Sequence, residues 1–191
     1  MSKQTIVKRK TKKKRNSRID LADFLLQDPS ESATTFHYEG TNKGDRLQDT
    51  KGRDHIFTGD GDDNVDIQGN TVQAMHSGDH VNLGSGDDRL KVTTSNGRNY
   101  FDAGSGDDRI TDSQADLHGI LGDGDDLYKY AGGNDFITLG LGRDEITIKR
   151  IDKITNPSQL IIHDFSVATD NVTGLRRKHG TFIWDNTLQA F

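Results

Sequence analysis

The amino-acid sequence predicts an all-β fold in which short strands wind into a solenoid. The segment from Thr41 to Ile148 repeats with a period of nine residues, its clearest units read Gly-x-Gly-x-Asp, and an apolar residue recurs two positions after the Asp. Repeats at a fixed period form stacked units that together bury a continuous core, which one unit alone cannot do. We therefore expect the repeats to stack as the coils of one body.

The register of the repeat is given by its Asp position, which recurs at Asp45, Asp54, Asp63, Asp79, Asp88, Asn99 (an Asn variant), Asp108, Asp126, Asp135 and Asp144. Leu117 takes one such position, and insertions of seven and two residues displace two others. Complete units alternate with weaker ones, so we expect coils of 18 residues with two short turns and two strands each. The complete units are Gly59/Gly61/Asp63, Gly84/Gly86/Asp88, Gly104/Gly106/Asp108, Gly122/Gly124/Asp126 and Gly140/Gly142/Asp144.

Each turn is followed by a predicted strand. The apolar position two residues after the Asp is filled in ten units, and Gly119 alone interrupts it: Leu47, Ile56, Val65, Val81, Leu90, Phe101, Ile110, Tyr128, Ile137 and Ile146. Many units add a second apolar residue two positions later, as at Ile67, Leu83 and Leu121. Spacing by two places both side chains on one face of a strand, which we expect to be the core face.

The Asp position predicts calcium sites. Stacked coils lie about 4.8 Å apart, and two unit charges at this separation repel by roughly 3 kcal/mol at an effective dielectric constant of about 20. Calcium would remove this repulsion, since it takes six to eight oxygen ligands in flexible geometry, and the carbonyl groups of glycine turns can approach an ion closely. We expect several ions between consecutive complete turns, with Asp45 and Asp63 as the first pair and Asp126 and Asp144 as the last. The opposite edge, through Asp54, Asp79, Asn99 and Asp135, is less regular. The candidate ligands are Asp45, Asp54, Gly59, Gly61, Asp63, Asp79, Gly84, Gly86, Asp88, Asn99, Gly104, Gly106, Asp108, Gly122, Gly124, Asp126, Asp135, Gly140, Gly142 and Asp144.

A second acidic residue precedes the repeat Asp in four of the complete units, at Asp62, Asp87, Asp107 and Asp125. These carboxylates could be additional ligands, acceptors that stabilise the turns, or solvated side chains. We favour a supporting role.

This pattern resembles the nonapeptide repeats of RTX (repeats-in-toxin) proteins, G-G-x-G-x-D-x-U-x with U apolar. The first Gly of that pattern is replaced here by Thr58, Leu83, Ala103, Leu121 or Leu139. The resemblance implies a right-handed parallel β-roll that binds calcium, and export by a type I system without an N-terminal signal peptide. The runs Ile162-His163-Asp164-Phe165 and Asp170-Asn171-Val172 are similar to the segment that closes such rolls.

The flanks divide the chain into four expected regions: a basic disordered tail over 1–18, an N-terminal cap with a short helix over 19–40, the roll over 41–150, and a C-terminal cap with a candidate secretion signal over 151–191. The helix is expected over Asp20–Gln27, capping strands over 158–165 and 181–184, and a surface loop over 66–78. The tail carries nine Lys or Arg and no acid, while the remaining 16 Lys and Arg face 30 Asp and Glu, a balance of −14. The tail could attach to an anionic polysaccharide or cell surface. Nothing indicates specific nucleic-acid readout.

No enzymatic motif is visible. The chain has no cysteine, no HExxH, no GxSxG and no apolar run long enough to span a membrane. His76 and His80 lie in a turn-like segment, where chance accounts for their spacing. We expect a non-catalytic calcium-binding module that folds outside the cell and serves a structural or adhesive role. The alternative is a small polysaccharide-modifying enzyme, or the targeting module of one.

Overall fold

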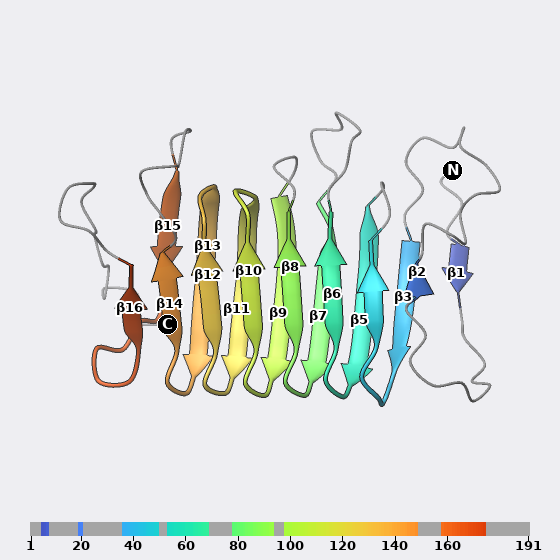
Figure 1. Cartoon of the computed structure of the whole chain (residues 1–191), viewed down its shortest axis with the longest axis horizontal. Coiled ribbons are helices and arrows are strands. Elements are labelled where there is room, and N and C mark those ends of the chain that lie inside the picture. The colour runs from blue at the N-terminus through green and yellow to red at the C-terminus, as the bar shows by residue number, and fades with distance from the viewer. Residues whose placement is uncertain are drawn as a thin grey trace, which may run out of the picture.

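The computed structural model describes residues 5–7, 19–20, 36–49, 53–68, 78–93, 98–148 and 158–174. In this part of the chain every regular element is a β-strand, and the strands form two parallel sheets stacked as successive coils (Figure 1). The prediction of an all-β parallel roll is confirmed. No helix among the described residues is long and apolar enough to cross a membrane.

The strands alternate between the two sheets along the chain. The odd sheet has the spatial order β1-β3-β5-β7-β9-β11-β13-β15, and the even sheet the order β2-β4-β6-β8-β10-β12-β14-β16. The odd strands are β1 (Thr5–Val7), β3 (Phe36–Thr41), β5 (Asp54–Asp60), β7 (His80–Ser85), β9 (Arg98–Ser105), β11 (Asp116–Asp123), β13 (Asn134–Leu141) and β15 (Gln159–Ile162). The even strands are β2 (Ile19–Asp20), β4 (Arg46–Gln48), β6 (Asn64–Ile67), β8 (Arg89–Val92), β10 (Arg109–Asp112), β12 (Leu127–Tyr130), β14 (Glu145–Ile148) and β16 (Asn171–Thr173).

Two sets of turns connect the sheets. The lower turns lead from an odd strand to the following even strand and lie at the bottom of Figure 1, and the upper turns lead from an even strand to the next odd strand. All complete glycine units fall in the lower turns. Both insertions belong to connections from an even strand to the next odd strand, β6 to β7 and β8 to β9.

The core lies between the sheets and is built from the predicted apolar positions, all of which are buried: Leu47, Ile56, Val65, Val81, Leu90, Phe101, Ile110, Tyr128, Ile137 and Ile146. Buried and more exposed residues alternate along the strands of the middle coils, such as β8 and β9, as period-two spacing requires. The exception at Gly119 has a steric cause. Gly119 pairs with Phe101 of the neighbouring strand, whose ring fills the space that a side chain at 119 would need. The ring of Phe101 thus fills the core at both positions.

The predicted flanks are described in part. Asp20 ends β2, and the rest of the expected helix Asp20–Gln27 lies outside the described residues. Of the expected tail over 1–18, Thr5–Val7 forms β1, which pairs with β3. The first expected C-terminal strand is present as β15, paired with β13, whereas residues 181–184 lie outside the described part. The four-region division remains a prediction.

Candidate metal sites in the turns

The lower turns hold a column of aspartates, one at the entrance to each even strand from β4 to β16. In each case the backbone N–H of one Asp donates to Oδ1 of the Asp one coil later along the chain. For Asp88 and Asp108 the N to Oδ1 distance is 2.8 Å. The same bond joins Asp45 to Asp63, Asp63 to Asp88, Asp108 to Asp126, Asp126 to Asp144 and Asp144 to Asp170, at 2.6–3.3 Å. The structure therefore brings the predicted lower-edge pairs together, and each carboxylate is held in a fixed orientation.

In the interior of the column, the second carboxylate oxygen has no protein partner. Oδ2 of five interior column members is buried and accepts no hydrogen bond: Asp63, Asp88, Asp108, Asp126 and Asp144. A buried polar atom without a partner is costly, and a buried charge costs more. The column therefore requires protons or cations when it is folded.

The protonation of the column reflects this cost. Burial, with the charges of neighbouring carboxylates adding to it, raises the pKa of Asp88 to about 7 and that of Asp108 to about 8. Burial likewise raises the pKa of Asp126 and of Asp144 to about 6. It also raises the pKa of Asp63. The folded column consequently binds protons more strongly than free carboxylates do, and a metal ion must displace them.

The glycines allow the turns to stack with their carbonyl groups close together. Gly104 and Gly106 have φ values of 103° and 127°, which favour glycine over any residue with a side chain. A Cβ atom on Gly104 would overlap the carbonyl oxygen of Gly84, and one on Gly106 would overlap that of Gly86. The same overlaps recur through the complete lower turns. Backbone carbonyl groups of one coil therefore lie directly against the glycines of the next, in the same turns that carry the column carboxylates.

This donor set selects among metals. Among the described residues, no three His, Cys, Asp or Glu side chains converge as possible ligands. Since each turn contributes one column Asp, further ligands would have to be backbone carbonyls. Such a site suits calcium, which takes six to eight oxygen ligands, and does not suit zinc, which prefers four ligands from Cys, His and carboxylates.

The neighbouring acidic residues form a second, exposed column that runs in the opposite direction. The N–H of Asp87 donates to Oδ1 of Asp62 at 3.1 Å, so here the acceptor belongs to the earlier coil. The N–H groups of Asp107, Asp125 and Arg143 continue the series at 2.9–3.0 Å. The structure thus gives these residues the supporting role of turn-stabilising acceptors.

At the ends of the lower column the carboxylates fold back on their own turns. Oδ2 of Asp45 accepts from the N–H of Thr41, and Oδ2 of Asp170 accepts from the N–H of Ser166, both at 2.7 Å. Asp170 extends the column by one coil beyond the predicted ligands, and it was missed because the nine-residue period stops after Ile148.

On the upper edge, the first three members of the predicted column resemble the lower one. The N–H of Asp54 donates to Oδ1 of Asp79 at 2.8 Å, and the N–H of Asp79 donates to Oδ1 of Asn99 at 2.9 Å. Oδ2 of Asp79 and Nδ2 of Asn99 are buried without partners. Burial raises the pKa of Asp79 to about 8.

Asp135, further along the upper edge, has donors for both carboxylate oxygens. Oδ1 accepts from the N–H of Leu117 at 3.0 Å, and Oδ2 accepts from the hydroxyl of Tyr128 at 2.6 Å. Asp112, which the nine-residue register does not single out, closes the adjacent turn by accepting from the N–H groups of Gln114 and Ala115 at 3.0 and 2.8 Å. Protein hydrogen bonds thus occupy both carboxylate oxygens of Asp135, which was a predicted ligand.

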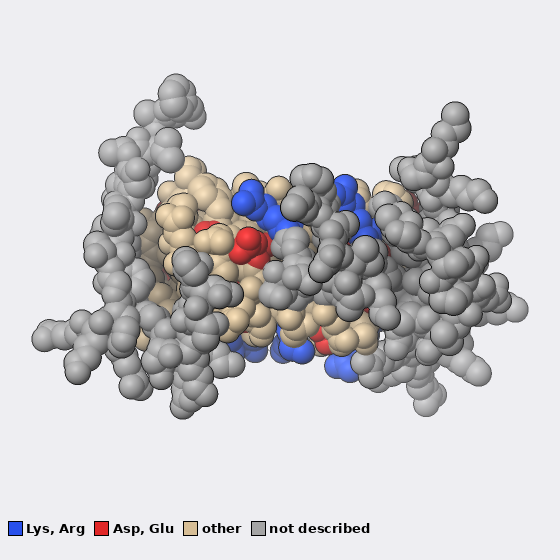
Figure 2. Space-filling view, turned by 90° about the horizontal axis from the view of Figure 1, so that it is seen from above, with Lys and Arg blue, Asp and Glu red and all other residues tan. Residues whose placement is uncertain are grey.

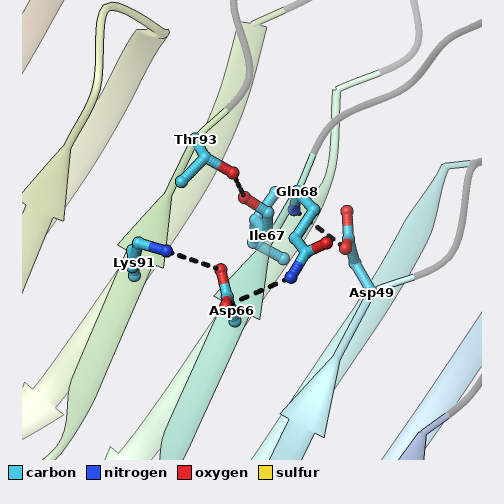
Figure 3. Close-up of polar contacts among 6 residues, drawn as sticks. All are labelled: Asp49, Asp66, Ile67, Gln68, Lys91 and Thr93. Atoms are coloured by element: carbon cyan, nitrogen blue, oxygen red, sulfur yellow. Dashed lines mark hydrogen bonds and ion pairs between the residues drawn. The ribbon is translucent and has the colours of Figure 1, made fainter.

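Side-chain contacts tie the first upper turns together (Figure 3). Oδ1 of Asp49 accepts from the N–H of Gln68 at 2.9 Å, and Asp66 pairs with Lys91 at 3.6 Å. The hydroxyl of Thr93 donates to the carbonyl of Ile67 at 2.9 Å. These contacts join consecutive coils near the point where the chain leaves β6 for the insertion.

Asp164 closes the last complete lower turn. Its two oxygens accept from the N–H groups of Leu139 and Gly140 at 2.6 and 2.9 Å. Asp164 lies in the run Ile162-His163-Asp164-Phe165, so this contact gives a physical role to the expected closing segment.

Comparison with known proteins agrees with this geometry. The family model for the RTX calcium-binding nonapeptide repeat matches in four copies, over residues 39–66, 92–113 and 130–146. No curated protein and no solved structure gave a match. The matched stretches cover lower and upper turns of the roll and include Asp45, Asp63, Asp108 and Asp144 of the aspartate column. Through residues 39–146, the chain therefore belongs to the RTX calcium-binding nonapeptide repeat family, and its roll is a calcium-binding module.

Proposed function

We propose that calcium ions bind between consecutive lower turns and that the roll folds when they bind. The observation that supports this most directly is the row of five buried Oδ2 atoms without protein partners. The proposed ligands are Asp63, Asp88, Asp108, Asp126 and Asp144 together with carbonyl groups of the glycines in their turns. On the upper edge, the space between Asp79 and Asn99 is the proposed additional site.

Calcium would couple folding to the surroundings of the protein. A site that exists only in the folded chain converts binding free energy into folding free energy, and the stabilisation grows with free ion concentration. RTX repeats are typical of secreted proteins. We therefore propose that the chain leaves the cell unfolded through a type I system and folds in the calcium-rich exterior, where the roll acts as a non-catalytic module.

A calcium titration followed by far-UV circular dichroism tests this function, with magnesium as the matched control because it demands a stricter octahedral geometry. We expect a cooperative rise in β signal with calcium alone. A full β signal in chelator that calcium does not stabilise against urea would refute the proposal.

A second role, adhesion to an anionic polysaccharide or cell surface, has its own support. Besides the nine basic residues over 1–18, the outward face of the even sheet pairs Arg89 directly with Arg109, both exposed. Like charges opposite each other destabilise a sheet, so an anionic ligand would relieve them. Figure 2, which looks onto the upper turns, shows Lys and Arg side chains toward both long sides of the described region.

Retention on immobilised heparin is compared for four proteins: the full chain and a chain that starts at Ser17, each with and without Arg109→Ala. The comparison separates the contribution of the basic tail from that of the even sheet. We expect both changes to weaken retention. Equal absence of retention in all four proteins would refute the adhesive role.

A further inference from the structure

The outward face of the odd sheet carries a continuous row of stacked rings. Neighbouring ring centroids lie 4.7–5.9 Å apart, and the planes of His55 and His80 are within 11° of parallel. We name this row the ring ladder; its members are His37, His55, His80, Tyr100, His118, Phe136 and His163. It extends across the coils in the direction in which they stack.

A depression of about 300 Å³ lies beside the middle of the ladder. The row of outward side chains next to the ladder consists of Phe57, Asn82, Asp102 and Ile120, which pair on consecutive strands of the odd sheet. The large side chains at the two ends are exposed, Phe57 by 51% and Ile120 by 44%. Between them, Nδ2 of Asn82 donates to Oδ2 of Asp102 at 3.5 Å. The depression thus has apolar ends, one wall of rings and a polar middle.

The fold itself does not require this face. Both sheets have inward apolar columns, but their outward faces differ. On the even sheet, the positions directly after the column Asp are Arg46, Asn64, Arg89 and Arg109, and no ring contact occurs among the described residues of this face. Of the six exposed large apolar side chains in the described part, four lie on the odd face: Phe57, Tyr100, Ile120 and Ile161. Exposed apolar side chains that gather in one region mark interaction sites.

The composition of the face defines the chemistry of its ligand. The outward edges of the stacked rings and the apolar ends suit a ligand that presents C–H groups. A neutral imidazole offers one donor and one acceptor, and the side chains of Asn82 and Asp102 add further hydrogen-bonding groups, so the polar partners suit hydroxyl groups. Asp102 is the only fixed charge that lines the depression, and it disfavours an acidic ligand. A ladder that runs over many strands suits an extended ligand rather than a compact one.

From these features we propose that the ring ladder binds a neutral polysaccharide, whose pyranose rings lie along it with the middle of the chain in the depression. Tyr100 and Phe57 contact the C–H faces of the sugar, and Asp102 and Asn82 bind its hydroxyls. This inference rests on the proposed function, because the strands that carry the ladder are joined by the lower turns whose stacking calcium would stabilise.

The test is a pull-down of the calcium-loaded full-length chain on insoluble cellulose, chitin and mannan, with immobilised polygalacturonate as the acidic arm. We expect retention on at least one neutral polymer. Joint replacement Phe57→Ala and Tyr100→Ala should weaken binding about tenfold, the effect of roughly 1.4 kcal/mol. Tyr100→Phe keeps the ring and should bind within about twofold of the parent. Thr111→Ala, on the outward face of the even sheet, is the control and should leave retention unchanged.

Circular dichroism of every variant in calcium separates binding from folding, and His118→Ala, on the neighbouring strand, replaces the double variant if that protein does not fold. Asp102→Asn keeps a hydroxyl acceptor and should retain binding; its complete loss would indicate a cationic ligand and overturn the proposal. Retention on the acidic polymer alone, on no neutral polymer, or equally by parent and ladder variants would also overturn it. If the fold forms in chelator and still binds the neutral polymer, the calcium proposal fails while the glycan proposal stands.

Discussion

Substitution of Asp108 distinguishes most clearly between a metal ligand and a carboxylate that only accepts a hydrogen bond. Its Oδ1 accepts from the N–H of Asp88, whereas its buried Oδ2 has no protein partner. An Asn side chain can keep the first contact and removes the negative charge at the second. The chain already contains this arrangement, since Oδ1 of Asn99 accepts from the N–H of Asp79 at 2.9 Å.

The two substitutions at this position differ in their expected effect. In chelator, Asp108→Asn should leave the free energy of unfolding unchanged or raise it, because it removes a carboxyl group that must be protonated to be buried, while the hydrogen bond persists. Asp108→Ala should cost about 1–3 kcal/mol in chelator, since the amide of Asp88 loses its acceptor.

In calcium, both substitutions should be strongly destabilising. Asp108 lies between Asp88 and Asp126, so two of the proposed ion spaces depend on it. An ion present at a hundredfold excess over its dissociation constant contributes about 2.7 kcal/mol, and loss of two such ions would cost about 5 kcal/mol.

Urea denaturation in excess calcium gives two of the four values. In chelator the chain is expected to be unfolded, so its negative free energy of unfolding is measured by folding it with an osmolyte such as trimethylamine oxide; far-UV circular dichroism follows both titrations. The decisive quantity is the difference between the two conditions for Asp108→Asn. If this substitution lowered the free energy of unfolding equally in both, the Asp108 carboxylate would be a hydrogen-bonding group only, and the calcium assignment at this position would be wrong.

Four further outcomes follow from the same geometry. Burial raises the pKa of Asp108 from 3.8 to about 8, so between these pH values the folded, metal-free roll holds more protons than the unfolded chain. Its stability should therefore fall as pH rises through this window, while its affinity for calcium rises. Calorimetry in buffers of different ionisation enthalpy should detect proton release on calcium binding. Gly106→Ala, at a positive φ and against a backbone carbonyl, should lower stability by about 1–3 kcal/mol, seen as a lower urea midpoint; an unchanged midpoint would contradict the stacking described. Asn99→Asp should raise the calcium stoichiometry in calorimetry and destabilise the chelated protein, because it adds a carboxylate next to Asp79. Tyr128→Phe should cost about 1–3 kcal/mol with or without calcium, since it removes the hydroxyl donor to Asp135; a cost confined to calcium would instead place an ion there.

The inward half of the fold could be predicted because period-two spacing fixes which side chains face the core. The buried columns through Ile56 and Ile110 follow directly from that spacing. The stacking of Phe101 over Gly119 did not, because it depends on how one large ring fills the neighbouring coil. The column aspartates were also predictable as a set, but the direction of their hydrogen bonds depends on the stagger between coils and required the structure.

The closed upper turns were missed for a different reason. The turn that Asp112 caps contains no glycine between β10 and β11, and Gln114 adopts a φ of 71° there, so the turn carries no recognisable motif. The hydroxyl of Tyr128 reaches Asp135 across the core, a contact that the nine-residue period does not encode.

The ring ladder did leave a signal in the sequence. Its members His55, His80, Tyr100, His118 and Phe136 each follow the Asp position of a weaker unit directly. When the weaker units are aligned with one another, the residue directly after the Asp position is a ring in each of these coils. The inward apolar positions alone do not indicate this.

The hydrogen bonds of the buried aspartate column give the roll a polarity. Each column amide finds its acceptor on the coil that follows, so a coil is complete only when its C-terminal neighbour is in place. The amides of Leu139, Gly140 and Asp144 meet their acceptors on Asp164 and Asp170. We therefore expect folding to nucleate at the C-terminal end, where the acceptor of each column amide is in place before the coil is added, and to proceed toward the N-terminus. A truncation before Asp164 would remove this seed, whereas a truncation of equal length at the start of the roll would remove only its last-formed coil.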